Sequence, residues 1–208
     1  MLIAIIGAGQ VGGTLGRAFQ KAGHTVAYGV RDPADPKVAP LKKESKATVT
    51  LPRDAVKGAD VILFATPWPA TRAAVESVGP LAGRIVVDCT NPIRSDFADL
   101  EAGPKSGGEQ VQEWAKGAKV VKCFNQVGFE VMADPHCGGG RAVMFTAGDD
   151  EGARSLVAGL ASEIGFEGLA LGPLSLARHL ESLGWTWIHG AVKAKAFGRR
   201  DAYAVLRR

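Results

Sequence analysis

Short apolar runs alternate with amphipathic stretches along most of this chain. The opening run from Leu2 to Ile6 is uniformly apolar, as is typical of a strand buried on both faces of a parallel sheet. Apolar residues at helical spacing follow from Val11 to Phe19, and Gly23 is well placed to end that helix. Residues from Thr25 to Val30 predict a second strand. The opening is therefore a strand, a glycine turn, a helix and a strand, which is one βαβ unit.

The same alternation continues toward the C-terminus. It predicts strands over 47–51, 61–65, 84–88, 119–124, 142–147 and 167–171, with helices over 54–57, 70–78, 111–115 and 151–164. Residues 95–108 are rich in glycine and charge and predict a surface loop. Residues from Leu174 to Ala191 predict one long apolar helix that packs on the sheet or forms a subunit interface.

This order of elements predicts the α/β class. We expect a doubly wound, mostly parallel Rossmann sheet with a long C-terminal helix and no separate large helical domain. Residues 1–208 would form a single dinucleotide-binding domain, with 174–208 as a C-terminal helical extension.

Composition narrows the class of protein. The chain of 208 residues has a formal net charge of +4, but its basic side chains are scattered, which argues against a nucleic-acid partner. No apolar stretch is long enough to span a bilayer, so no membrane partner is expected. The three cysteines Cys89, Cys123 and Cys137 are widely spaced and form no C-x-x-C pair. They favour reduced thiols, no metal site and a cytoplasmic location.

The glycines after the first strand predict the main ligand. Gly7, Gly9 and Gly12 form the pattern G-x-G-x-x-G at the mouth of a helix, around Gln10 and Val11. Such glycines permit a tight turn, a close approach of the pyrophosphate and close contact between helix and strand. The pyrophosphate would then lie on the N-terminus of the helix, which favours negative charge. We therefore expect these residues to bind a dinucleotide.

The end of the second strand bears on which dinucleotide is bound. Domains that bind NAD usually carry Asp or Glu about 20 residues past the glycine turn. This chain has Val30 and Arg31 there, and a guanidinium pairs well with the 2′-phosphate of NADP. Lys37 would add a second positive charge. The alternative is that Asp32 selects the cofactor and Arg31 is only solvated. The pattern favours NADP(H).

Polar residues also follow the fourth, fifth and sixth strands, where open parallel sheets bind ligands. The side chains expected to contact the cofactor are Thr66, Pro67, Trp68 and Asn91. Those expected to border a hydride acceptor are Trp68, Asn91, Asn125 and Val127. These side chains are suited to positioning the ligands, not to transferring protons. No catalytic residue is predicted, because the cofactor carries the chemistry.

The four histidines add one further candidate. His136, beside Asp134 and Cys137, is the histidine kept as a candidate functional residue, whereas His24, His179 and His189 are interpreted as structural.

With these motifs the chain resembles the NADP oxidoreductase, coenzyme F-420-dependent family, nearly end to end. The resemblance is carried by residues 3–12, 28–31, 88–92, 122–125, 130–135 and 172–174, and residues 202–208 are similar to the family's last helix. It implies hydride transfer between NADPH and a planar small-molecule acceptor such as the deazaflavin coenzyme F-420, in a homodimer or higher homo-oligomer. The chain departs from deazaflavin reductases at Ala8 and Gln10, and in the run from Gln126 to Gly128.

Two other functions stay open at this point. One is an NADPH-dependent reductase of a small imine or carbonyl compound, in which a helix of a partner subunit closes the site. The other is a non-catalytic NADP(H) sensor, which the lack of an obvious general acid allows.

Overall fold

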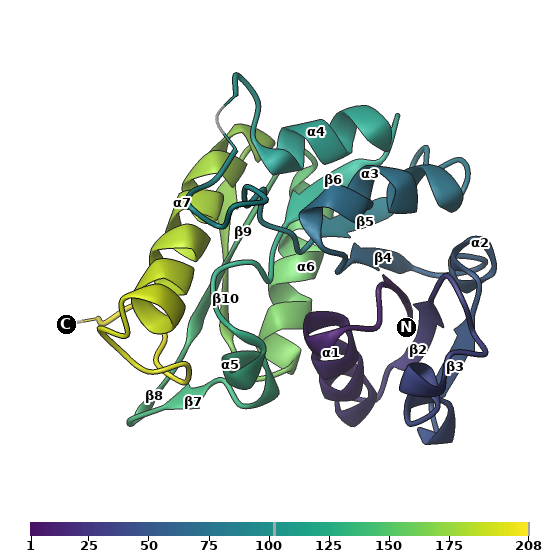
Figure 1. The fold of residues 1–208 in the computed structure, drawn as a ribbon, viewed down its shortest axis with the longest axis horizontal. Coiled ribbons are helices and arrows are strands. Elements are labelled where there is room, and N and C mark those ends of the chain that lie inside the picture. The colour runs from purple at the N-terminus through teal and green to yellow at the C-terminus, as the bar shows by residue number, and fades with distance from the viewer. Residues whose placement is uncertain (102, 208) are drawn as a thin grey trace.

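The computed structural model describes residues 1–101 and 103–207. Its centre is an eight-stranded sheet with strand order β10-β9-β6-β5-β4-β1-β2-β3 (Figure 1). The strands that run parallel to one another are β1 (Leu2–Ile6), β2 (Thr25–Gly29), β3 (Ala47–Thr50), β4 (Val61–Phe64), β5 (Ile85–Asp88) and β6 (Lys119–Lys122). Then β9 (Val143–Gly148) pairs antiparallel with β6, and β10 (Glu167–Gly172) runs parallel to β9. The strand order reverses at β1, which has β2 on one side and β4 on the other, and this is where such sheets bind ligands.

Helices cover both faces of the sheet, which confirms the doubly wound α/β fold (Figure 1). One face carries α1 (Gln10–Lys21), α5 (Phe129–Ala133) and α6 (Glu151–Glu163). The other carries α2 (Pro52–Ala55), α3 (Trp68–Ser77) and α4 (Gly107–Trp114). Short 3-10 turns lie at Pro36–Val38, Leu41–Lys43 and Leu174–Leu176.

The C-terminal part differs from the prediction. The helix α7 covers Ala177–Ile188 and continues as a π-helical turn at His189–Lys193. The long C-terminal helix is therefore present, and residues 174–193 are the helical part of the expected extension. Residues 194–207 form neither helix nor strand, so the similarity of residues 202–208 to the family's last helix is not accompanied by a helix in the described residues; residue 208 lies outside them. The reason is that this segment bonds to its neighbours, since Tyr203 O accepts from Val143 N and Asp201 O from Trp187 Nε1.

The predicted surface loop contains regular structure at its end. The surface loop expected over 95–108 ends earlier, because Ser106 caps α4 and forms a capping box with Glu109; residue 102 lies outside the described residues. The glycine-rich stretch around residues 138–140 is part of a hairpin of β7 (His136–Cys137) and β8 (Gly140–Arg141). Conversely, β6 ends two residues before the predicted position, since Phe124 adopts a φ of 58°.

Three charged side chains are buried together where β5, β6 and α7 meet. Lys122 Nζ lies 2.8 Å from Asp88 Oδ2 and 2.8 Å from Glu181 Oε1, and it donates to Thr90 O at 2.6 Å. The Glu181 carboxylate also accepts the first two backbone N–H groups of α4, at 3.0 and 2.9 Å. The cluster therefore connects the sheet to α4 and α7.

Electrostatics holds this lysine in its charged form. Burial by itself would lower the pKa of Lys122, but the attraction of Asp88 and Glu181 outweighs burial and raises the pKa above the ordinary lysine value. A raised folded-state pKa means that the lysine stabilises the fold at neutral pH, and that this contribution is lost only as the pH rises through that pKa.

We expect Lys122→Met to lower the free energy of unfolding by about 3–5 kcal/mol, because it leaves two buried carboxylates without a cation. Urea unfolding measures this.

The matched control is Lys119→Met on the same strand. Lys119 pairs with Asp150 at the surface, with side chains 45% and 34% exposed, so its loss should cost less than about 1 kcal/mol. Equal losses in the two variants would contradict a special role for the buried cluster.

Candidate functional site

The glycine turn between β1 and α1 has the geometry that its motif predicts. Gly7 has a φ of 103°, which a side chain would strain, and a Cβ there would lie 2.7 Å from Ala65 O. A Cβ on Gly12 would collide with Gly7 O, so only glycine lets the helix lie this close to the turn. Gly9 differs, because apart from the adjoining backbone no atom of the described residues lies within 4 Å of its Cβ position. The space next to Gly9 is therefore open to a ligand.

The N-terminus of α1 is suited to an anion. Gly9 is the N-cap, no side chain caps the helix, and its first turn holds no acidic residue. The first N–H groups of a helix have no partners within the helix, and the dipole adds partial positive charge. Gln10 is exposed and Val11 is half-buried at this end. Backbone donors and dipole together form a site for a phosphate group.

The end of β2 presents a positive side chain. Val30 is half-buried against the core, and Arg31 is exposed and makes no ion pair with any other described residue. Asp32 Oδ1 accepts from Ala34 N at 2.8 Å, so that carboxylate is engaged with its own loop. Lys37 is exposed in the 3-10 turn that follows. Among the described residues, Arg31 and Lys37 thus both offer a positive charge that no ion pair engages.

The predicted site residues in the turn after β4 differ in how exposed they are. Pro67 is exposed, and Thr66 Oγ1 lies 3.0 Å from Thr71 Oγ1 at the start of α3. Trp68, in contrast, is only 9% exposed, because its ring packs against Trp114 at 5.4 Å between centroids and its Nε1 donates to Glu101 at 2.8 Å. The indole therefore connects α3 to α4 instead of projecting from the edge of the sheet.

The turns after β5 and β6 bring two predicted asparagines together. Asn91 Nδ2 donates to Asn125 O at 2.8 Å, and Asn125 Nδ2 donates to Asn91 Oδ1 at 2.9 Å and to Leu180 O at 3.0 Å. Asn125 is 4% exposed and lies behind Asn91, which is half-buried. Val127 is 6% exposed and packs in the core. Asn91 is thus the member of this group that reaches the edge of the sheet.

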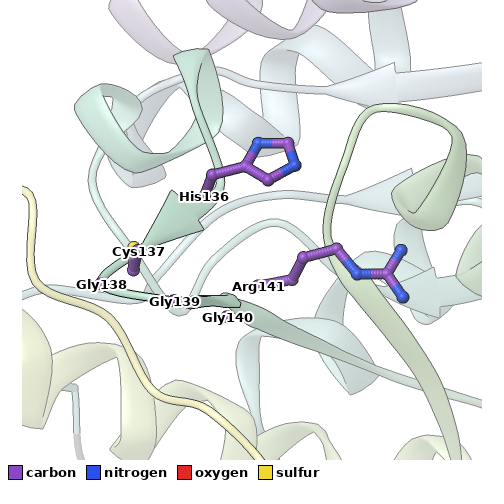
Figure 2. A pocket seen from close by; sticks show the side chains of 6 residues that line it. All are labelled: His136, Cys137, Gly138, Gly139, Gly140 and Arg141. Carbon is purple, nitrogen blue, oxygen red and sulfur yellow. The ribbon is translucent and has the colours of Figure 1, made fainter.

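The hairpin that holds His136 is a separate feature. Figure 2 shows His136 and Arg141, whose backbones are opposite each other in the register of β7 and β8, with the three glycines of the turn beside them. His136 Nδ1 lies 3.1 Å from Asp134 Oδ1, and both side chains are largely exposed. Burial, with a smaller effect of Asp134 and Asp201, raises the pKa of Cys137, so this thiol is not activated. Cys137 is therefore not a candidate nucleophile, and a functional role of His136 stays a prediction.

His24, Cys89 and Cys123 have structural surroundings. His24 Nε2 pairs with Glu163 Oε2 at 2.6 Å and is buried at the end of α1. Cys89 and Cys123 are buried free thiols whose pKa is raised chiefly by burial.

Sequence reasoning missed two residues that shape this edge of the sheet. Glu181 and Gly184 lie on the inner face of α7, where Glu181 bonds Lys122 and Gly184 leaves room for the asparagine pair. A Cβ on Gly184 would lie 2.5 Å from Asn125 O and 2.9 Å from Asn91 Oδ1. A glutamate and a glycine within an apolar helix are the signals that could have indicated them.

The described residues hold neither a membrane-spanning helix nor a metal-binding cluster. Within 1–101 and 103–207, helices long and apolar enough to cross a membrane are absent. The same part of the chain contains no group of three or more His, Cys, Asp or Glu side chains placed to hold a metal ion.

Comparison with known proteins points to a family of NADP oxidoreductases. A family profile described as "NADP oxidoreductase coenzyme F-420-dependent" matches residues 2–92. A crystal structure provisionally assigned as an F-420-dependent NADP reductase of Arthrobacter sp. FB24 is 31% identical, with a TM-score of 0.87 and 99% of each chain covered.

More distant relatives share part of this architecture. Metalloreductase STEAP3 of Rattus norvegicus is 29% identical over 182 residues, which are 87% of this chain and 36% of that protein. The chain thus spans about a third of this curated relative. A reductive aminase of Aspergillus terreus, in complex with NADPH4, cyclohexanone and allyl amine, shares the fold at 22% identity and a TM-score of 0.65, covering 87% of this chain and 58% of its own. On the near end-to-end match to the Arthrobacter structure, the chain belongs to the NADP oxidoreductase, coenzyme F-420-dependent family.

Proposed function

We propose that this protein is an NADP(H)-dependent oxidoreductase that transfers hydride between NADPH and a planar acceptor. The observation that carries the proposal is the open space beside Gly9, at an uncapped helix N-terminus. The unpaired Arg31 stands at the end of the neighbouring strand β2. Backbone N–H groups would hold the pyrophosphate and the guanidinium the 2′-phosphate.

The remaining residues of the edge would position the reactants. When bound, NADPH supplies a hydride from C4 of its nicotinamide, and the acceptor takes up one proton from solvent. Thr66 and Pro67 follow β4, which is next to β1 in the sheet, and Asn91 follows β5, the strand beyond β4. All three would border the nicotinamide. None of them is a strong acid or base, so their part is orientation and the exclusion of water.

For the acceptor we propose the deazaflavin coenzyme F-420. Support comes from family membership and from the name given to the Arthrobacter protein. Reduction of a small imine or carbonyl compound is the alternative that the fold of the reductive aminase allows. Assembly into a homodimer or higher oligomer, and a single domain over residues 1–208, stay predictions.

Replacing glycines of the turn should separate binding from folding. We expect Gly9→Ala to cost at most about 1 kcal/mol of stability, as an N-cap change does. It should weaken NADPH binding about tenfold, since the added methyl occupies the space proposed for the phosphate. Gly12→Ala should lower stability by about 1–3 kcal/mol or more, because of the collision with Gly7 O. Thermal unfolding and NADPH titration measure both; unchanged NADPH affinity in Gly9→Ala would contradict the phosphate site.

Removing the charge of Arg31 should discriminate between the two dinucleotides. Arg31→Ala loses a charge-assisted phosphate contact worth about 1.5–3 kcal/mol with NADPH and almost nothing with NADH. The control is Arg72→Ala, since Arg72 is exposed on α3 and pairs with Glu76. Isothermal titration with both cofactors tests this, and equal weakening of NADPH and NADH would point to Asp32 or another selector.

The acceptor is tested by turnover. Protein saturated with NADPH should reduce oxidised coenzyme F-420, followed by the loss of its absorbance, and should do so far faster than it reduces a cyclic imine. Tight NADPH binding with imine turnover alone would replace the deazaflavin by the alternative acceptor, and tight binding without any turnover would favour the sensor.

A further inference from the structure

Three side-chain amides form a continuous hydrogen-bonded series that begins at the backbone of β9. Phe145 N donates to Gln126 Oε1 at 3.0 Å, and Gln126 Nε2 donates to Phe145 O at 2.9 Å. A backbone N–H can only donate and a backbone carbonyl can only accept. The orientation of the Gln126 amide is therefore determined by the strand.

The Gln126 amide in turn determines the orientation of the Asn125 side chain. Gln126 Nε2 uses its second hydrogen to donate to Asn125 Oδ1 at 3.1 Å. The Nδ2 of Asn125 must then lie on the opposite side, where it donates to Leu180 O at 3.0 Å and to Asn91 Oδ1 at 2.9 Å. Both N–H groups of Asn125 are used inside the protein, so this side chain has no donor left for a ligand.

Asn91 is the end of the series. Its Oδ1 faces Asn125, which requires its Nδ2 to point toward Asn125 O, and the two atoms lie 2.8 Å apart. Among the described residues, Asn91 Nδ2 makes only this bond, so its second hydrogen is free. One lone pair of Oδ1 is free as well. Gln126 and Asn125 are 1% and 4% exposed, whereas Asn91 is half-buried at the carboxyl edge of β5.

The backbone around the series is adapted to hold it. Phe124, directly before Asn125, has a φ of 58°, a left-handed conformation that few residues other than glycine adopt. Its side chain is 1% exposed in the core, which keeps that turn in place. On the other side, Gly184 of α7 leaves the space in which the two asparagines meet. Strain that surrounding packing maintains in this way is typical of functional sites.

We propose that Gln126 is a positioning residue that, through Asn125, sets the direction of the Asn91 amide toward the carboxamide of the nicotinamide. This inference rests on the proposed NADP(H) site. Asn91 then offers one N–H and one carbonyl oxygen, and the nicotinamide carboxamide offers the complementary pair. With its amide reversed, Asn91 would lose its bonds to Asn125, so only one orientation is available to the ligand.

The experiment compares a ligand that carries nicotinamide with one that lacks it. NADPH and 2′,5′-ADP share the adenine half, so a positioning fault at Asn91 should affect the first and not the second. Gln126→Leu should raise the Kd of NADPH about fivefold to tenfold, the loss of one neutral hydrogen bond, and leave the Kd of 2′,5′-ADP unchanged. Unchanged binding of 2′,5′-ADP also shows that the variant is folded.

Gln112→Leu is the matched control. The Gln112 amide also bonds backbone, donating to Ala118 O at 3.0 Å and accepting from Val120 N at 3.4 Å, but at the opposite end of β6. It should alter neither Kd. Gln126→Glu provides a second variant, because a carboxylate still accepts from Phe145 N but cannot donate to Asn125 Oδ1. It should weaken NADPH binding as Gln126→Leu does.

A further pair of variants separates this inference from the proposed function. If Asn91→Ala leaves NADPH affinity unchanged, the placement of nicotinamide at Asn91 is wrong. If Asn91→Ala weakens NADPH but both Gln126 variants do not, the positioning role is wrong. Support requires that the double variant Asn91→Ala/Gln126→Leu binds NADPH no more weakly than Asn91→Ala alone, since Gln126 would act only through Asn91.

Discussion

The ammonium of Lys122, buried between Asp88 and Glu181, is the contact on which the rest of the architecture depends. Burying charges costs free energy, and the cluster is stable only because every hydrogen bond is made. The three hydrogens of the ammonium meet two carboxylates and the carbonyl of Thr90, and Glu181 also accepts the first N–H groups of α4. One cluster thereby places α4 and α7 against the carboxyl ends of β5 and β6, directly below the loops of the proposed site.

The two ends of the proposed site carry different kinds of chemical group. The helix N-terminus at Gly9 and the guanidinium of Arg31 are suited to negative charge at the phosphate end. Neutral amides lie at the other end, where a nicotinamide would need orientation rather than charge. The buried ions Lys122, Asp88 and Glu181 pair with one another and connect the sheet to α4 and α7. This division explains how a site without a strong acid or base can still be specific.

Much of the fold followed from local pattern. The alternation of apolar runs and amphipathic stretches predicted the strands and most helices, because burial on both faces of a parallel sheet demands uniformly apolar strands. Tertiary contacts decided what local preference could not. Trp68 follows a strand as expected, and only the structure shows that its ring packs on Trp114. The segment 194–207 bonds to β9 and α7 instead of forming a helix.

The sequence by itself determined the fold class, the glycine turn and the positive residue after β2, because these depend on short spacings and on the backbone freedom of glycine. Tertiary structure alone decided how the distant polar residues combine. Asn91 and Asn125 are 34 positions apart, as are Asp88 and Lys122. Which of them bonds the other, and which reaches the edge of the sheet, depends on strand order and on how α7 packs. A hydrogen bond requires partners within about 3 Å, and no local pattern encodes such a distance between separate strands.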